Sequence, residues 1–332
     1  MKNRVSLVVL NYNGLHHLEE YFTSVFSQSR VPDQVIMLDN NSTDTSREYV
    51  KKSFPQVTVV HNKTNEATAG GSNRGFEHAV GDYVIFQSND LRLDKNCIKR
   101  LVDVMEENPL IGICTSVFIK YDVANKGIRE VDNAGGIEDV YGFGMQKYPN
   151  ELLVNIPQQE EVFFSYGSSF IVRRDIYKRV GGFDERYFTL NDDIDLSWRI
   201  RLLGLRVVYD KRSFVYHKGS ATLGTLFQRS RKRYWSERNA CATLLKDASV
   251  LHLIRYLPFY FILLFAEIGY MMYRRKYTMS FAIVKAIAWN IKELPRTLSL
   301  RMKVERLDKN VESQLQTSSF KLKLANGFRS SL

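Results

Sequence analysis

The sequence predicts an α/β fold in which a mostly parallel central sheet is flanked by helices and followed by a helical extension. Short apolar runs rich in β-branched residues alternate with stretches of helical apolar spacing over roughly the first two thirds of the chain. Such alternation is typical of right-handed βαβ units and a parallel sheet. From Thr225 onward, basic and aromatic clusters and a long apolar run replace it, which predicts a change of architecture.

The individual elements are predicted from apolar patterns and boundary residues. Segments with the composition of buried strands are Val5–Leu10, Gln34–Leu38, Val57–His61, Tyr83–Gln87, 113–118, 162–172 and Val207–Val215. Segments with helical spacing are His16–Gln28, Thr68–Val80 and 96–112. We expect the second of these helices to begin as a loop at Gly70–Asn73 and Gly167–Ser169 to interrupt the sixth strand. The stretch 121–161 is polar and punctuated by glycine, which predicts loops or short hairpins.

The composition is that of a folded, strongly basic protein. Of 332 residues, 44% are hydrophobic and 25% are charged, and the net charge is +11. This balance excludes a disordered chain and predicts an anionic partner: a phosphorylated substrate, a nucleic acid or an anionic membrane surface. Cys97, Cys114 and Cys241 have neither disulfide-framework nor zinc spacing and suit a reducing compartment. The first apolar run is too short for a secretory signal, so we expect none.

Polar residues follow three of the predicted strands. Asn11, Asp39 and Asp90 each stand where a strand ends. Because ligands bind at the carboxyl ends of strands in open α/β sheets, these residues predict a ligand site at one edge. The first strand is not followed by G-x-G-x-x-G, which argues against an ordinary dinucleotide-binding fold.

The stretch Gly181–Gly204 combines a turn, three aspartates and a helical run. Asp192 and Asp193 fall where the helix should begin, and Gly204 is a natural stop. Acidic residues favour a first turn because the helix dipole stabilises them, so capping alone explains their presence. A catalytic role is the alternative. In either case the dipole and the free N–H groups predict that both carboxylates stay ionised.

The C-terminal part predicts contact with a membrane. Leu257–Tyr273 is apolar apart from Glu267 and is followed by three basic residues. A spanning helix needs roughly 20 apolar residues, and this run is shorter and contains Pro258. We therefore expect an interfacial helix, with a true span and a helix packed on the protein as alternatives. The predicted boundaries are a domain over 1–245, an apolar and basic extension over 246–300, and a polar tail over 301–332.

Taken together, the motifs of the first 245 residues resemble those of the family 2 glycosyltransferases of GT-A fold, and especially the rhamnosyltransferase-like subgroup that builds bacterial surface polysaccharides. The matching segments follow the family's order: Val8–Asn13, Asp39–Asp44, Asn65–Gly75, Ser88–Asp90, Gly182–Glu185, Asp192–Arg199 and His217–Ser220. Two departures are Ala67 in place of a glycine and Ser88 in place of the first acid of an Asp-X-Asp motif.

The resemblance implies a nucleotide-sugar donor bound by the N-terminal half, 1–95. The residues that it assigns to the donor are Leu10, Asn11, Tyr12, Asp39, Asn41, Gly70, Gly71, Asn73 and Asn89. For Asp39 the alternative is a turn-forming role before Ser42. The resemblance also implies a divalent cation, Mn²⁺ or Mg²⁺, held by Asp90 with His217 as a further ligand, although a lone histidine is often structural.

The acceptor side is assigned to residues 96–245. The resemblance implies Asp193 as catalytic base and Asp192 as its neighbour, with the two exchanged if the motif shifts by one residue. Asp195 is expected to brace the preceding loop. The residues expected to contact the acceptor are Trp198, Arg233, Trp235 and Arg238. The Gln-x-x-Arg-Trp signature of processive synthases is not matched by Gln228–Lys232, so we expect one sugar per encounter.

The predicted function is metal-dependent, inverting transfer of one sugar from a UDP- or dTDP-sugar, for example dTDP-rhamnose, to a surface polysaccharide or lipid-linked saccharide. We expect a cytoplasmic enzyme associated with the inner face of the membrane and no nucleic-acid partner. The alternatives are a sugar nucleotidyltransferase, which would need a basic Gly-rich loop at Asn11–Leu15, and an inactive membrane scaffold. A membrane- or RNA-binding protein is a further alternative, but it would explain only the positive charge and none of the motifs.

Overall fold

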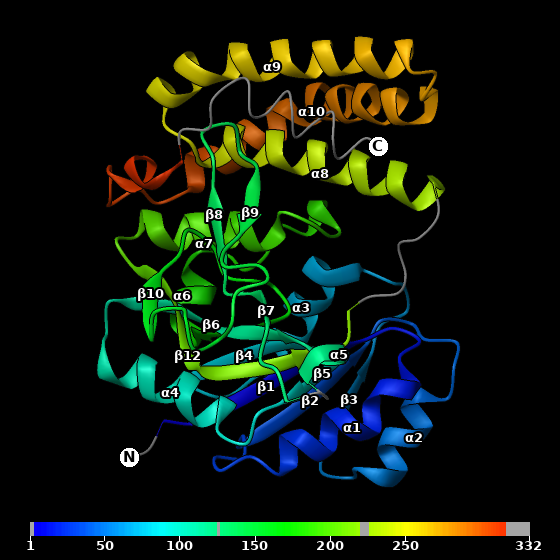
Figure 1. Ribbon diagram of the computed structural model, residues 1–332, viewed down its shortest axis with the longest axis vertical. Helices are drawn as coiled ribbons and strands as arrows, with labels where there is room; N and C mark the ends of the chain where they lie inside the picture. Colours follow the sequence, from blue (N-terminus) through cyan, green and yellow to red (C-terminus); the bar gives the residue numbers. More distant parts are fainter. Residues whose placement is uncertain (1–2, 125–126, 220–225, 317–332) are drawn as a thin grey trace. The chain divides into compact units, whose positions relative to one another are not determined.

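The computed structural model describes residues 3–124, 127–219 and 226–316 (Figure 1). Its contacts divide the chain into two compact units. The first lies within residues 1–136 and 146–220, and the second within 137–145 and 221–332. The expected domain boundary at residue 245 falls inside a helix of the second unit.

The first unit is built on one ten-stranded sheet among the described residues. The strand order is β10-β12-β6-β11-β4-β1-β2-β3, with β5 paired to β12 and β7 to β6. The strands are β1 (Val5–Asn11), β2 (Gln34–Asp39), β3 (Thr58–His61), β4 (Tyr83–Ser88), β5 (Leu91–Leu93), β6 (Ile111–Lys120), β7 (Val131–Asn133), β10 (Gln159–Glu161), β11 (Ser169–Arg173) and β12 (Arg206–His217).

Most of the long strands run in one direction, which confirms the predicted mostly parallel sheet. β1 is parallel to β2 and β4, β2 to β3, and β6 to β12, whereas β11 is antiparallel to both β4 and β6. The carboxyl ends of β1, β2 and β4 therefore meet at one edge, where Asn11 is in register with Asp39 and Leu10 with Ser88.

Helices cover both faces of this sheet (Figure 1). They are α1 (Leu15–Phe26), α2 (Ser46–Ser53), α3 (Ala67–Glu77), α4 (Cys97–Glu107), α5 (Tyr121–Ala124), α6 (Arg174–Arg179) and α7 (Asp192–Leu202), with a 3₁₀ turn, η1, at Glu185–Tyr187. Leu7 and Val9 of β1 pack in one core with α1 and α4, whereas Val8 packs in the other with α3 and α7. Because alternate side chains enter cores on opposite faces, the run Leu7–Leu10 of β1 is apolar without a break.

One local prediction was wrong and another held in part. Gly70–Asn73 is not a loop but part of α3, which begins at Ala67. The stretch 162–172 is interrupted as predicted, by a turn at Tyr166–Ser169, but only the part from Ser169 forms a strand, β11, which runs between β4 and β6. The region 121–161 forms α5 and short strands, in agreement with the expected hairpins, although residues 125–126 lie outside the described part.

The second unit is mainly helical. It contains α8 (Leu226–Asp247), α9 (Val250–Tyr273), α10 (Tyr277–Lys303) and a 3₁₀ turn, η3, at Val311–Gln314. The turn between β8 (Gly136–Glu138) and β9 (Gly144–Gln146) also belongs to it. The predicted tail is described only to residue 316.

Helix α9 has two apolar sides. His252, Tyr260, Leu264, Glu267 and Met271 are buried at helical spacing. The charge of Glu267 is neutralised by Arg233 of α8, with which it forms an ion pair. The opposite side exposes large apolar residues, namely Leu251, Ile254, Phe259, Ile262, Phe265 and Met272. Within the described residues, α9 is the one helix that is long and apolar enough to cross a membrane.

The packing of α3 on β1 depends on Gly75, which generates a prediction. A Cβ atom at this position would lie 2.3 Å from Cγ1 of Val8. Gly75→Ala should therefore destabilise the protein by about 1–3 kcal/mol through overpacking, measured as a lower midpoint of thermal unfolding. The control is Gly269→Ala in α9, where a Cβ meets nothing within 4 Å and the change should be neutral or stabilising. Equal midpoints for the two variants would contradict this account of α3.

Candidate active site

The ends of β1 and β2 are joined by a buried polar network. Asn11 donates from Nδ2 to Oδ1 of Asp39 (3.1 Å) and to Oγ of Ser42 (3.1 Å). Oγ of Ser42 accepts a further hydrogen bond from the N–H of Asn13 (2.9 Å). The network fixes the two loops that leave this edge of the sheet.

Asp39 lies at the bottom of this network and is completely buried. Its Oδ2 accepts the N–H of Ser42 (3.1 Å) and lies 3.2 Å from Nδ1 of His61 and 3.6 Å from Nε of Arg47. This arrangement supports the turn-forming alternative for Asp39. Contact of its carboxylate with a nucleoside remains a prediction and requires movement of His61 or Arg47, which are both partly exposed above it.

Other residues assigned to the donor are better placed to meet a ligand. Tyr12 is 54% exposed directly after β1, and Leu10 is partly exposed. Asn41 is exposed with a φ of 65°, a conformation that asparagine tolerates better than most residues. All three reach solvent at or just after the ends of β1 and β2, and we call them the rim of the proposed donor site.

The glycines of α3 serve helix packing. A Cβ on Gly71 would lie 2.7 Å from Nδ2 of Asn40 and 3.1 Å from side-chain carbons of Leu10 and Leu38. A Cβ on Gly70 would meet the side chain of Glu66 at 2.7 Å. Both glycines are buried. This geometry therefore does not support the expectation that they let the backbone approach a ligand. Here the small residue lets a helix lie close to the sheet.

Asn73 ties α3 to the segment that precedes α7. Its Oδ1 accepts from the hydroxyl of Tyr177 (2.6 Å) and the N–H of Phe183 (3.0 Å). Its Nδ2 donates to the carbonyl of Phe183 (3.0 Å) and to Oε1 of Glu185 (3.0 Å). An amide side chain offers two donors and two acceptor lone pairs, so all are used. In this structure Asn73 bonds only within the protein, and its contact with the donor stays a prediction.

A second tie comes from the first turn of α3. The N–H groups of Thr68 and Ala69 donate to the carbonyl of Phe188 (3.0 and 3.4 Å). Phe188, Leu190 and Asn191 all have positive φ, at 59°, 67° and 60°. Such conformations are strained for bulky residues and persist only when their surroundings hold them. The otherwise unpaired N–H groups of α3 thus hold the turn that leads into α7.

The segment Ser88–Asp90 at the end of β4 forms side-chain hydrogen bonds to β1 and within itself. Nδ2 of Asn89 donates to Oδ1 of Asn11 (2.6 Å). Oγ of Ser88 donates to Oδ1 of Asp90 (2.5 Å). Ser88, which replaces an acid of the family motif, therefore orients the remaining carboxylate.

His217, at the end of β12, stands between two carboxylates. Its Nδ1 donates to Oδ2 of Asp132 in β7 (2.9 Å), and its Nε2 lies 3.4 Å from Oδ2 of Asp90. Burial opposes protonation, but hydrogen bonds and charges from Asp132 and Asp90 raise the pKa of His217 to about 9. Burial likewise opposes ionisation of Asp90, but His217, Ser88 and His17 lower its pKa overall.

These residues fit a divalent cation in part. The bond from Nδ1 to Asp132 fixes the ring orientation and leaves Nε2 facing Asp90, as outer carboxylates do for metal-binding histidines. Among the residues described, no group of three or more His, Cys, Asp or Glu side chains gathers around one point. If a divalent cation binds here, Asp90 and His217 would offer two ligands, and the others would have to come from the donor or from water.

Asp192 and Asp193 begin α7, as predicted. Asp193 is partly exposed, and its Oδ2 and Oδ1 accept the N–H groups of Gly167 (3.0 Å) and Ile194 (2.9 Å). Asp192 is buried and lies within hydrogen-bonding reach of the Thr68 side chain. Of the two carboxylates, Asp193 is the one that solvent reaches.

The expectation that both carboxylates stay ionised needs correction. Burial raises the pKa of each above its ordinary range, and the neighbouring charge of Asp193 raises that of Asp192 further. The two N–H groups on Asp193 favour its ionised form. The pair therefore loses its first proton mainly from Asp193, and Asp192 holds its proton to higher pH.

Tyr166 connects these groups. Burial, together with the charges of Asp193, Asp132 and Asp90, raises its pKa to about 12. Its ring packs edge-on against Phe118, with centroids 4.9 Å apart. Phe118 also packs edge-on against His217 (centroids 5.7 Å apart), and Gly167, next to Tyr166 in the chain, donates to Asp193. The base candidate and the cation candidate therefore lie on either side of the Tyr166–Phe118 contact. The sequence analysis missed Tyr166 and Asp132.

A comparison with protein families identifies the family of the chain. The family model described as glycosyl transferase family 2 matches residues 6–181, more than half of the chain. The chain belongs to glycosyl transferase family 2.

Individual relatives agree with this assignment. The chain is 27% identical over 243 residues to the N-acetylglucosaminyl-diphospho-decaprenol L-rhamnosyltransferase of Mycobacterium tuberculosis, covering 67% of this chain and 78% of that protein. The predicted membership of the rhamnosyltransferase-like kind is thereby confirmed.

Solved structures confirm the GT-A fold. The structure of GalNAc-T7 with UDP, GalNAc and Mn²⁺ matches with a TM-score of 0.58 and 16% identity, over 74% of this chain. This chain spans about half (48%) of the length of that protein. The mannosyltransferase PcManGT from Pyrobaculum calidifontis, in complex with GDP-Man and Mn²⁺, matches with a TM-score of 0.57 and 18% identity, over 88% of each chain.

In this glycosyltransferase Asp195 is a structural brace, although by a different route from that expected. It forms an ion pair with Arg199 one helical turn later. Arg199 in turn donates to the carbonyl of Val180 (2.6 Å). The brace therefore holds the start of the Gly181–Phe188 segment to α7.

The expected acceptor contact from Trp198 is wrong for this structure. Trp198 is fully buried in α7, and its ring packs edge-on against Phe163 with centroids 5.2 Å apart. Trp198 instead occupies a core position of α7.

The other acceptor candidates of the glycosyltransferase lie in α8 of the second unit. Arg233 pairs with Glu237 (2.9 Å) and with Glu267, and Arg238 is buried with its guanidinium 4.6 Å from the ring of Trp289. Both arginines hold helices together in this structure. Trp235 is half-buried, and its contact with an acceptor remains a prediction, as do those of Arg233 and Arg238.

The raised pKa of Asp192 leads to a prediction for stability. Because the folded state keeps a proton that the unfolded chain releases near pH 4, stability should fall as pH rises above about 4 and through neutrality. Asp192→Asn removes this ionisation, so the stability of the variant should decrease less with rising pH. The midpoint of thermal unfolding, measured between about pH 5 and 8, tests this prediction. Parallel curves for the variant and the wild type would contradict the raised pKa, and Asp103→Asn on the surface of α4 is the control.

Proposed function

We propose that this enzyme transfers one sugar from a UDP- or dTDP-sugar to a hydroxyl of a lipid-linked saccharide or surface polysaccharide precursor, with inversion at the anomeric carbon. The observation that carries the proposal is geometric: the ring of Phe118 packs against both Tyr166 and His217, with centroids 4.9 and 5.7 Å away. Nε2 of His217 lies 3.4 Å from Oδ2 of Asp90, and Gly167, next to Tyr166 in the chain, donates its N–H to Oδ2 of Asp193 (3.0 Å). The name of the mycobacterial relative makes dTDP-rhamnose and a diphosphate-linked polyprenol the first substrates to test.

The donor side of this mechanism uses the edge of β1, β2 and β4. Tyr12, exposed at 54%, offers an aromatic face to the base, and Asn41 lies beside it on the rim. Asp90 and His217 would hold a divalent cation against the diphosphate, and such a cation stabilises the charge of the leaving group. His217 is oriented for this by Asp132 (2.9 Å).

The acceptor side uses Asp193. The acceptor oxygen forms its bond to the anomeric carbon as the bond from that carbon to the diphosphate breaks, and the electron pair leaves with the diphosphate. Asp193 accepts the hydroxyl proton. The N–H groups of Gly167 and Ile194 orient its carboxylate for this step. Asp192, which keeps its own proton longer, does not compete as a base at neutral pH.

We further propose that the enzyme works at the inner face of the cell membrane. The exposed apolar side of α9, from Leu251 to Met272, is typical of a surface that contacts lipid. Arg274, Arg275 and Lys276 follow directly and favour anionic headgroups.

Donor binding and transfer can be separated by two substitutions. UDP or dTDP should raise the unfolding temperature only with Mn²⁺ present, since a bound ligand stabilises the fold by mass action. Asp90→Asn should lose this effect, whereas Asp103→Asn on α4 should keep it. Asp193→Asn should keep donor binding and lose about 10²- to 10⁴-fold in transfer rate.

Two outcomes would contradict the assignment. If neither nucleotide stabilised the wild-type protein with Mn²⁺, the transferase proposal would fail and an inactive scaffold would be favoured. An active Asp193→Asn variant together with an inactive Asp192→Asn variant would move the base to Asp192.

A further inference from the structure

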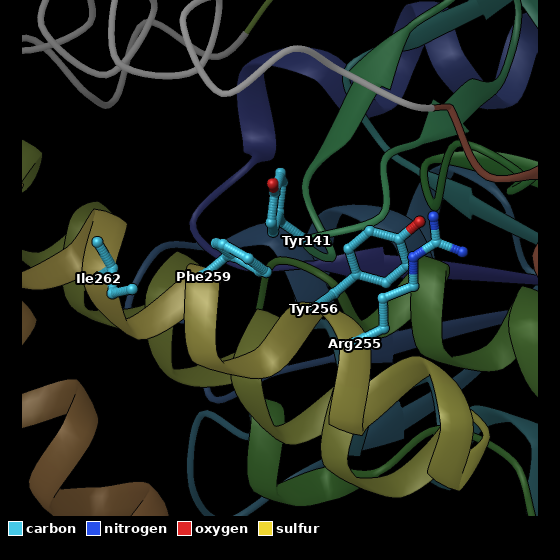
Figure 2. A pocket seen from close by; sticks show the side chains of 5 residues that line it. All are labelled: Tyr141, Arg255, Tyr256, Phe259 and Ile262. Atoms are coloured by element: carbon cyan, nitrogen blue, oxygen red, sulfur yellow. The ribbon is translucent and has the colours of Figure 1, made fainter.

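The second unit contains a pocket that the proposed mechanism does not use. It has a volume of about 380 Å³ and is lined by Tyr141, Arg255, Tyr256, Phe259 and Ile262. Tyr141 comes from the turn between β8 and β9, and the other four residues lie along α9 (Figure 2). Phe259 and Ile262 are about half exposed (49% and 53%), so the pocket opens on the apolar outer side of α9.

The wall formed by Tyr141 is fixed by contacts within the unit. Nε2 of His252 donates to the carbonyl of Val140 (2.8 Å). Oδ1 of Asp139 accepts the N–H groups of Tyr141 (2.9 Å) and Phe143 (3.1 Å). The ring of Tyr141 meets that of Tyr256 edge-on, with centroids 6.0 Å apart. The pocket is therefore formed before any ligand arrives.

Gly142 makes this turn possible. Its φ is +80°, and a Cβ there would lie 2.8 Å from Cγ of Leu244 in α8. Only glycine adopts this conformation and fits this space without strain. The turn is thus shaped to place Tyr141 against α9.

The chemistry of the lining indicates an apolar ligand with an anionic end. Three aromatic rings and one aliphatic side chain form the walls. The single charged lining residue is Arg255, which is exposed, stacks 5.2 Å from the ring of Tyr256 and has no ion-pair partner among the described residues. In Figure 2 its guanidinium extends beside that ring, at one end of the pocket. A guanidinium is well suited to phosphate oxygens.

The size of the pocket indicates how much of a ligand it holds. Ligand pockets commonly span about 300–1,000 Å³, and this one lies near the lower limit. It suits one stretch of a single chain better than the paired chains of a phospholipid.

We propose that this pocket binds the first isoprene units of a polyisoprenyl diphosphate, with the diphosphate on Arg255. The inference rests on the proposed function, because it assigns a binding site to the lipid part of a lipid-linked acceptor. The exposed apolar side of α9 would then keep the rest of the chain in the membrane.

Binding of farnesyl diphosphate to the full-length protein tests the proposal by calorimetric titration in detergent. Arg255→Gln and Ile262→Trp, which fills the pocket, should each weaken binding by about tenfold or more, as expected for a lost charge-assisted contact or a blocked cavity. The matched controls are Arg296→Gln and Ile291→Trp. Both residues are exposed on α10, lie outside the pocket lining, and should leave the affinity unchanged when substituted.

Three results would overturn the proposal. Inorganic diphosphate that binds as tightly as farnesyl diphosphate would show that no chain is recognised. Equal losses in the control variants would show a non-specific surface. Displacement of farnesyl diphosphate by a lower concentration of phosphatidylglycerol would assign the pocket to phospholipid.

A transfer assay separates failure of this proposal from failure of the proposed function. With a panel of UDP- and dTDP-sugars, Ile262→Trp should raise KM for a polyprenyl diphosphate-linked acceptor and leave KM for a water-soluble glycoside unchanged. Transfer to both acceptors with wild-type KM values would overturn the pocket alone. If no sugar were transferred while farnesyl diphosphate still bound to the pocket, the proposed function would fail and the binding site would stand.

Discussion

The hydrogen bonds between α3 and the segment before α7 are the constraint on which the active site depends. α3 packs on β1 and β2, whose ends form the proposed donor side, and the Asn73 amide bonds to Tyr177, Phe183 and Glu185. The first turn of α3 holds the carbonyl of Phe188. Three residues of positive φ then lead directly into Asp192 and Asp193. The strain of this turn is offset by N–H groups that otherwise have no partner in the helix.

Burial and hydrogen bonding together separate the roles of neighbouring carboxylates. Asp192 and Asp193 are adjacent in sequence, yet Asp193 receives two backbone N–H groups and solvent, whereas Asp192 is enclosed. Asp90 differs from both because, although burial raises its pKa, the hydrogen bond and charge of His217 lower it overall. In the proposed mechanism Asp90 would therefore hold the cation, Asp193 would accept the proton, and Asp192 would stay neutral to the highest pH.

The sequence predicted the strands and their polar ends because these features are local: an apolar run and the residue after it. It failed where tertiary contacts decide. The sequence around Trp198 and Gly71 is compatible both with a ligand site and with a core position. Only the packing in the structure distinguishes the two. Asp132 lies in a polar, Gly-punctuated stretch, and its meeting with His217 depends on the pairing of β7 with β6. The charge state of Asp192 was mispredicted because burial outweighs the helix dipole.

The most direct test of this account is the effect of Asn73→Ala on donor affinity and on turnover, measured separately. The account predicts a dissociation constant for the nucleotide within about twofold of wild type and a kcat lowered by about tenfold or more, because α7 would lose its position while the donor side stays intact. Tyr177→Phe, which removes one hydrogen bond to Asn73, should give a smaller change of the same kind. Loss of nucleotide affinity with an unchanged kcat would contradict the account and make Asn73 a donor ligand.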